Sequence, residues 1–347
     1  MTFFADISLN QRRTRLFLAL APLVFLAASL VGCDVMKSSG YSEDWREGVD
    51  GKTVESISYA EESWNKIDMF LPAELTPEKS RGAFFYIHGG SWKAGSRRDM
   101  RGFARRMTKA GYVSASMEYM LFNDKNRDAY SIFAVLDEID AALATLKEEA
   151  AKRGIELDRV ALGGDSAGGH IVSLYAYSRG KNAPIPVAFI APRVAPIDFH
   201  PDAWTTLRPE AVDGLVYLLR GKRAFPKEET PDAGSEIESA IDAVSPLSYL
   251  NAETCVPTIA AYGGQDPLIG VNHLPKLAAK FAELGAKSID DVDPADKDAV
   301  VFDPIEYPKS GHMLAMDPDC AGRFYELNLK YAERYLNCDE SDSQNEK

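Results

Sequence analysis

The chain has 347 residues, which is enough for one large domain or two small ones with a sizeable buried core. Apolar residues make up 46% of it and charged residues 26%, proportions that are ordinary for a globular protein. The formal net charge of −13 argues against nucleic acid as a partner, because binding a phosphate backbone requires a basic surface.

The N-terminal segment has the pattern of a targeting signal. A basic stretch at residues 12–15 precedes an apolar run at residues 16–31, which is slightly short for a membrane span of roughly 20 residues. The run ends in Leu30-Val31-Gly32-Cys33, which resembles the lipobox of bacterial lipoproteins. The resemblance implies cleavage before Cys33, a diacylglycerol on its thiol, and a protein anchored to a lipid bilayer in the cell envelope, outside the cytoplasm. The alternative is an uncleaved signal anchor.

These signals divide the chain into segments. We expect a signal peptide at residues 1–32, the lipidated cysteine and a polar tether at residues 33–50, and one folded domain at residues 51–338. A charged, proline-containing stretch breaks the rhythm of this domain, and we interpret residues 199–245 as a lid insertion. The polar tail, residues 339–347, is expected to be disordered.

Strands and helices alternate along the predicted domain. The continuous apolar run at residues 82–87 is typical of a central strand covered on both faces. The alternation predicts an α/β fold with a mainly parallel central sheet flanked by helices. Strands are predicted at residues 54–59, 67–71, 82–87, 112–117, 160–162, 187–190, 258–262 and 300–305, and helices at residues 100–110, 131–153, 209–219, 274–284 and 323–336, with a further helix directly after residue 169.

A glycine-rich run follows the predicted strand at residues 160–162 and precedes a helix. It reads Gly164-Asp165-Ser166-Ala167-Gly168-Gly169, and its G-x-S-x-G core matches a nucleophile elbow, in which the serine sits on a tight strand-to-helix turn. The turn needs glycines because side chains would collide there. A phosphate-binding loop is the alternative, but the Lys-Ser/Thr of a P-loop does not follow. Ser166 is therefore the candidate nucleophile.

A serine hydroxyl needs a base, and that base needs an acid to orient it. The sequence holds five histidines, and His312 is the one in a loop after the last predicted strand, where the chain order Ser…Asp…His places the base. Asp266 follows a strand between the elbow and this histidine and is the candidate acid. Asp198 also follows a strand and remains its main rival.

The charge that develops on a substrate carbonyl must meet fixed N–H donors. Gly89 and Gly90 follow the central strand and offer main-chain N–H groups without side chains. Ala167, directly after the nucleophile, offers another. We predict an oxyanion hole from these three residues; a simple tight turn at the two glycines is the alternative.

From about residue 67 to residue 336, the chain resembles an α/β-hydrolase of the esterase/lipase group, near the hormone-sensitive-lipase-like branch. His88-Gly89-Gly90 and the run from Gly164 to Gly169 carry the resemblance. That branch usually has a third glycine where Ser91 stands. His88-Gly89-Gly90-Ser91-Trp92 is instead similar to the H-G-G-x-W of arylformamidases and of some bacterial feruloyl- and acetyl-esterases. The resemblance implies the α/β-hydrolase fold and the same site residues.

These motifs predict a serine carboxylesterase that hydrolyses small-molecule carboxylic esters through an acyl-enzyme. An arylformamidase-like amide hydrolase and a catalytically inactive binding lipoprotein are the alternatives. No metal or other cofactor is expected, because the sequence has neither an H-E-x-x-H motif nor a cysteine cluster. The sequence leaves the oligomeric state open.

In an oxidising compartment the remaining cysteines can pair. Cys320 and Cys338 flank the predicted C-terminal helix, whose ends lie roughly 25 Å apart at 1.5 Å per residue, too far for a disulfide. Cys255 precedes a strand that should run antiparallel to this helix. We therefore predict a disulfide between Cys255 and Cys338.

Overall fold

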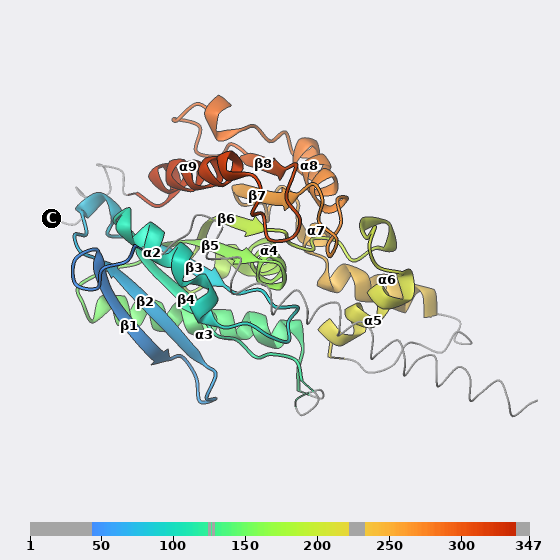
Figure 1. Ribbon diagram of the computed structural model, residues 1–347, viewed down its shortest axis with the longest axis horizontal. Coiled ribbons are helices and arrows are strands. Elements are labelled where there is room, and N and C mark those ends of the chain that lie inside the picture. The colour runs from blue at the N-terminus through green and yellow to red at the C-terminus, as the bar shows by residue number, and fades with distance from the viewer. Residues whose placement is uncertain (1–43, 124–125, 127–128, 222–232, 338–347) are drawn as a thin grey trace, which may run out of the picture.

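A computed structural model describes residues 44–337 apart from 124–125, 127–128 and 222–232. Its centre is an eight-stranded sheet in the order β1-β2-β4-β3-β5-β6-β7-β8 (Figure 1). β2 pairs antiparallel with both of its neighbours, and the pairs from β4 through β3 to β8 are parallel. The strands are β1 (Gly51–Ser58), β2 (Lys66–Pro72), β3 (Gly82–Ile87), β4 (Val113–Met117), β5 (Arg159–Asp165), β6 (Val187–Arg193), β7 (Thr258–Gly263) and β8 (Phe302–Tyr307).

Helices cover both faces of this sheet. α2 and α9 contribute to one apolar cluster, while α3, α4 and α8 contribute to the other. Consecutive residues of β3 point to opposite clusters, Phe84 to the first and Phe85 to the second, and every residue of the strand is buried. The predicted α/β class and the two-sided central strand are confirmed. The helices are α2 (Arg101–Lys109), α3 (Ile132–Ala151), α4 (Ala167–Arg179), α5 (Pro209–Leu219), α6 (Ala233–Val244), α7 (Pro246–Tyr249), α8 (His273–Glu283) and α9 (Pro318–Tyr335).

The described part of the expected lid insertion includes the α-helices α5 and α6, which lie side by side at the end of the molecule away from β1 (Figure 1). The sequence predicts α5 at its observed bounds but does not predict α6. α6 carries Ile237, Ala240, Ile241 and Val244 at the spacing of an amphipathic helix, but three acidic residues lie in the same segment and the prediction treats the whole stretch as charged. The charged stretch therefore contains a helix that was not predicted.

The chain enters the domain before β1. Residues 44–50, the last part of the expected tether, contact the domain: the Trp45 ring packs edge-on against Phe70 at 6.4 Å, and Lys109 donates to the carbonyl of Asp44. The predictions for residues 1–43 and 339–347, and for Cys338 as partner of Cys255, fall outside the described residues. None of the described helices is both long and apolar enough to cross a membrane.

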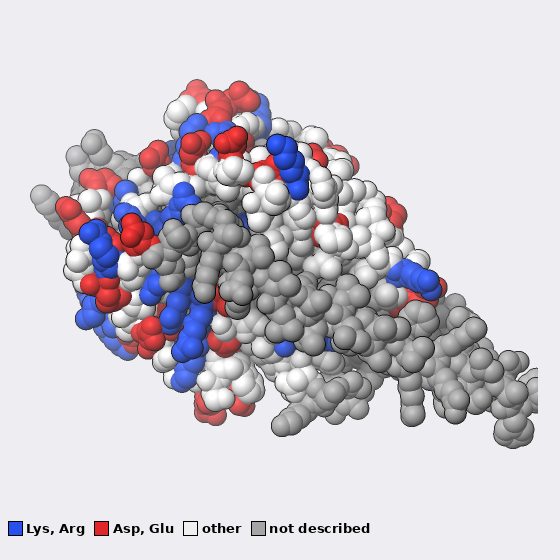
Figure 2. Space-filling model, in the orientation of Figure 1, with Lys and Arg blue, Asp and Glu red and all other residues white. Residues whose placement is uncertain are grey.

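Charged side chains are interspersed on the face of the molecule shown in Figure 2, with Lys and Arg beside Asp and Glu. They are frequent over the part that carries β1, β2 and α2, whereas uncharged residues predominate over β7, α7 and α8. The net negative charge of the chain is thus not gathered into one acidic patch on this face.

Candidate active site

Ser166 occupies a strained turn between β5 and α4. Its φ of 54° and ψ of −118° lie in a region that non-glycine residues rarely adopt and that costs of order 1–3 kcal/mol. Main-chain hydrogen bonds fix the turn on both sides: the N–H of Ser166 donates to the carbonyl of Arg193 at 2.9 Å, and the N–H of His170 donates to the carbonyl of Ser166 at 2.9 Å. Strain held in this way is typical of a functional residue.

The glycines around Ser166 allow the turn to pack closely. A Cβ on Gly168 would lie 2.1 Å from the main-chain oxygen of Ile87 and 2.6 Å from that of His88. A Cβ on Gly164 would lie 2.6 Å from the main chain of Gly168. No real Cβ approaches main-chain atoms so closely, so both positions need glycine, as the elbow prediction requires.

His312 and Asp266 are joined by a short hydrogen bond. His312 Nδ1 lies 2.7 Å from Asp266 Oδ2, and the Asp266 side chain is fully buried whereas that of His312 is 13% exposed. The other oxygen of Asp266 accepts from the N–H groups of Leu268 at 2.8 Å and Ile269 at 3.1 Å. An ionised carboxylate only accepts, so Nδ1 carries the proton and Nε2 of His312 is free to act as a base.

The rival acid, Asp198, has other partners. Its carboxylate contacts His200 Nδ1 at 2.6 Å and Lys276 Nζ at 2.7 Å. Burial favours the protonated form, but the hydrogen bonds from Lys276 and His200 outweigh it and hold the pKa of Asp198 below its ordinary value. The structure thus brings Asp266, not Asp198, together with His312.

Ser166, Asp266 and His312 follow β5, β7 and β8, whose carboxyl ends lie at the same edge of the sheet. Burial raises the pKa of Asp165, next to the nucleophile, and the nearby charges of Arg193 and His312 oppose this rise. His312 is therefore within electrostatic range of the elbow. Among the described residues, no hydrogen bond joins the Ser166 hydroxyl to His312; such bonds are often long in enzymes without substrate.

The loop after β3 lies directly against the elbow. A Cβ on Gly89 would lie 2.7 Å from the carbonyl of Asp165 and 3.4 Å from the Cβ of Ser166. His88 Nδ1 donates to the carbonyl of Gly89 at 2.7 Å. In the same trans peptide the N–H of Gly90 points to the opposite side, away from His88. Ala167 is the first residue of α4, where the helix dipole favours negative charge. The predicted oxyanion donors thus come from the two segments that meet at Ser166.

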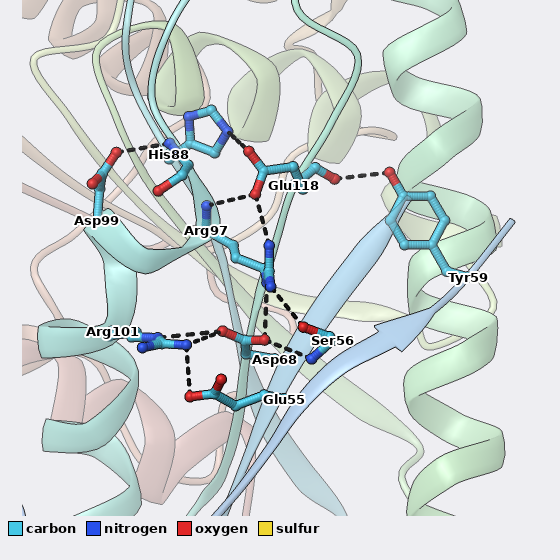
Figure 3. A network of polar contacts seen from close by, with 10 residues as sticks. Glu55, Ser56, Tyr59, Asp68, His88, Arg97, Asp99, Arg101 and Glu118 are labelled. Atoms are coloured by element: carbon cyan, nitrogen blue, oxygen red, sulfur yellow. Dashed lines mark hydrogen bonds and ion pairs between the residues drawn. The ribbon is translucent and has the colours of Figure 1, made fainter. Parts of the chain in front are cut away.

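Sequence reasoning missed a polar network behind this loop (Figure 3). His88 Nε2 lies 4.0 Å from the Glu118 carboxylate. The Arg97 guanidinium pairs with Glu118 at 3.0 Å and with the fully buried Asp68 at 2.9 Å. Arg101 also contacts Asp68, at 2.8 Å. Burial raises the pKa of Asp68, but the hydrogen bonds from both arginines outweigh this effect and keep it low. An aspartate within the apolar strand β2 is the sequence signal that marks such a buried carboxylate.

The other histidines do not contact Asp266 by hydrogen bonds. His88, His170 and His273 are fully buried, and His200 contacts Asp198. Burial lowers the pKa of His170 and of His273 to about 4. Within the described ranges, no group of three or more His, Cys, Asp or Glu side chains could hold a metal ion.

Comparison with solved structures supports the fold. Esterase B from Lactobacillus rhamnosis aligns over 94% of this chain and 98% of its own with a TM-score of 0.64 at 18% identity. A bacterial heroin esterase aligns over 87% of this chain and 89% of its own with a TM-score of 0.60 at 17% identity. The chain therefore has the α/β-hydrolase fold.

In sequence, the chain is similar to one protein family and to curated proteins named as esterases or hydrolases. Residues 67–200 match the BD-FAE family model, which covers β2 to β6 with the oxyanion loop and the elbow. LipR of Mycobacterium tuberculosis is 27% identical over 191 residues, 54% of this chain and 56% of LipR. Esterase LipQ of the same organism is 22% identical over 234 residues, 65% of this chain and 51% of LipQ. The chain thus spans about half the length of these two relatives.

Proposed function

We propose that this protein is a serine carboxylesterase that acts on small-molecule carboxylic esters. The observation that carries the proposal is the strained backbone of Ser166 at a strand-to-helix elbow, on the sheet edge that also holds the paired His312 and Asp266. Relatives and structural neighbours whose names include esterase support this reaction class.

In the proposed mechanism each residue has a role. Nε2 of His312 takes the proton of the Ser166 hydroxyl as its oxygen attacks the ester carbonyl, and the N–H groups of Gly89, Gly90 and Ala167 stabilise the oxyanion. The imidazolium, held by Asp266, returns the proton to the departing alcohol, which leaves an acyl-enzyme. Water, deprotonated by the same histidine, then releases the carboxylic acid and restores the serine.

Labelling with a fluorophosphonate tests the nucleophile. We expect the purified protein to be labelled and to hydrolyse p-nitrophenyl acetate, butyrate or octanoate, and Ser166→Ala to lose both properties. Ser178→Ala is the matched control, because Ser178 lies on the same helix and only donates to the carbonyl of Leu174 at 2.6 Å. Undiminished turnover in Ser166→Ala would overturn the mechanism.

The same assay separates the alternatives. If N-formyl anilides are cleaved faster than esters, the formamidase alternative is favoured. The motif His88-Gly89-Gly90-Ser91-Trp92 supports that alternative. A folded wild-type protein that is neither labelled nor active would favour a binding lipoprotein. The acyl-chain preference of an active protein would begin to define its substrate.

We also infer that the protein is anchored in the cell envelope by a lipid on Cys33. The lipobox-like Leu30-Val31-Gly32-Cys33 supports this inference. An alkyne analogue of palmitate fed to expressing cells should label the wild type but not Cys33→Ser, which should also leave the membrane fraction. Label retained by Cys33→Ser would show that the cysteine is not the lipidated residue.

A further inference from the structure

The turn that follows the oxyanion glycines is strained. Ser91 and Trp92 have φ values of 54° and 60°, and the N–H of Lys93 donates to the carbonyl of Gly90 at 3.0 Å. Two successive positive φ angles closed by such a bond are the features of a type I′ turn. That turn favours Asn and Gly, whereas serine and tryptophan pay steric strain in it. The local sequence therefore does not hold this turn by itself.

The side chain of Trp92 anchors the turn in the core. Trp92 is 5% exposed, and its indole N–H donates to Nδ1 of His170 at 3.2 Å. The two rings meet edge to face with centroids 5.4 Å apart, and Phe199 packs beside both. The main-chain oxygen of Trp92 accepts from the N–H of Phe122 at 2.8 Å. Burial and hydrogen bonding at Trp92 thus oppose the backbone strain.

His170 has the tautomer that this contact requires. Its Nε2 lies 2.8 Å from the main-chain oxygen of Val244, the last residue of α6. A carbonyl only accepts, so Nε2 carries the proton and Nδ1 presents its lone pair to the indole. Burial lowers the pKa of His170 to about 4, which keeps the ring neutral near pH 7. Both ring nitrogens are engaged and the side chain is buried, so His170 does not serve as a catalytic base.

His170 therefore joins three parts of the site. It lies on α4, four residues after Ser166, and it contacts the turn after Gly90 and the end of the lid helix α6. Gly90 belongs to both the turn and the oxyanion hole. A Cβ on it would lie 2.1 Å from the carbonyl of Ala94, so the turn and the glycine cannot shift independently.

We propose that His170 is a positioning residue of the oxyanion hole: by accepting the indole N–H of Trp92 it holds the strained Ser91–Trp92 turn and thereby the direction of the N–H groups of Gly89 and Gly90. The proposal rests on the esterase function proposed above. It also gives a physical reason for the Ser-Trp pair where the related branch has a third glycine: glycine adopts such a turn freely, and here a buried tryptophan enforces it.

Three variants of the purified protein test this role. His170→Leu removes the acceptor, and we expect kcat for p-nitrophenyl butyrate to fall about tenfold or more with little change in KM, since a misplaced oxyanion donor costs up to about 10²–10³ in rate. His170→Asn keeps an acceptor at the position of Nδ1 and should retain kcat within about threefold. Adding Ser91→Gly to His170→Leu relieves the strain at Ser91 and should restore part of the lost kcat.

Asn328→Leu is the matched control for the loss of a buried hydrogen bond. Asn328 is 4% exposed on α9 and donates to the carbonyl of Phe324 at 2.8 Å. It should lower the melting temperature without lowering kcat. An equal fall of kcat in Asn328→Leu, a wild-type kcat in His170→Leu, or no recovery with Ser91→Gly would each overturn the positioning role.

A measurement independent of activity tests the contact itself. In ¹⁵N-indole NMR spectra, the Trp92 N–H should be protected from exchange in the wild type and in His170→Asn and lose protection in His170→Leu. Equal protection in His170→Leu would refute the hydrogen bond. An active wild type with unaltered His170 variants overturns only this proposal, whereas an inactive folded wild type overturns the esterase function as well.

Discussion

Replacing Asp266 by asparagine should invert the tautomer of His312. One oxygen of Asp266 accepts two main-chain N–H groups, from Leu268 and Ile269, and the other accepts from His312 Nδ1 at 2.7 Å. The asparagine oxygen must keep the two main-chain donors, because an NH₂ group facing them would leave three donors together. The NH₂ group then faces His312. Nδ1 must accept from it, and the ring proton moves to Nε2, where the base is needed.

The size of the effect follows from this inversion. A histidine protonated at Nε2 cannot take the proton of Ser166, and the loss of a correctly oriented triad acid lowers kcat by about 10⁴ in serine hydrolases. That corresponds to about 5 kcal/mol of transition-state stabilisation. The fold should change little, because the main-chain bonds are preserved and asparagine has the same shape as aspartate. We therefore expect a near-normal melting temperature with almost no turnover.

Asp198→Asn is the informative control. This variant weakens contacts with His200 and Lys276 but leaves His312 untouched, so it should lower stability and keep kcat within about threefold. Steady-state hydrolysis of p-nitrophenyl butyrate and thermal unfolding would be measured for both variants. Retention of more than a tenth of the wild-type kcat by Asp266→Asn, or an equal loss in Asp198→Asn, would refute the assignment of the acid.

Three further predictions concern stability. His170 and His273 have pKa values of about 4 in the folded protein, against 6.5 for an ordinary histidine, so both bind protons more readily when the protein is unfolded. The free energy of unfolding should therefore fall by about 3 kcal/mol for each histidine as the pH drops from 6.5 towards 4. Urea titrations should show a smaller fall in His273→Gln than in the wild type. Gly168→Ala places a Cβ 2.1 Å from a main-chain oxygen and should lower the free energy of unfolding by at least about 1–3 kcal/mol. Gly322→Ala is the control: a Cβ there meets open space on α9, so thermal unfolding should show unchanged or higher stability. Arg97→Met removes one of the two arginines that contact the buried Asp68 carboxylate, while Arg101 remains. It should cost about 1.5–3 kcal/mol in urea unfolding, and a cost below about 0.5 kcal/mol would show that the contact is dispensable.

The sequence predicted the parts of the fold whose burial is uniform. Residues 82–87 form β3 at the predicted bounds because a strand covered on both faces is apolar throughout. Residues 209–219 form α5 as predicted, since Pro209 begins the helix and an apolar run fills it. α6 was missed although Ile237, Ala240, Ile241 and Val244 keep helical spacing, because acidic residues interrupt the pattern and the contacts of α6 with α5 and with His170 cannot be read from it. Neither contact is local in sequence.

The residues of the candidate site also differ in how far the local sequence predicts them. The elbow could be found from local spacing, because its glycines and serine are consecutive and each answers a steric need of one turn. The sequence favoured Asp266 as the acid, but its local spacing did not exclude Asp198, since each follows a strand and each lies before the histidine. Lys276 and His200 neutralise Asp198, and Lys276 lies 78 residues further along the chain. A carboxylate already paired with a lysine is a poor partner for a developing imidazolium, which favours Asp266 as the acid of the proposed triad.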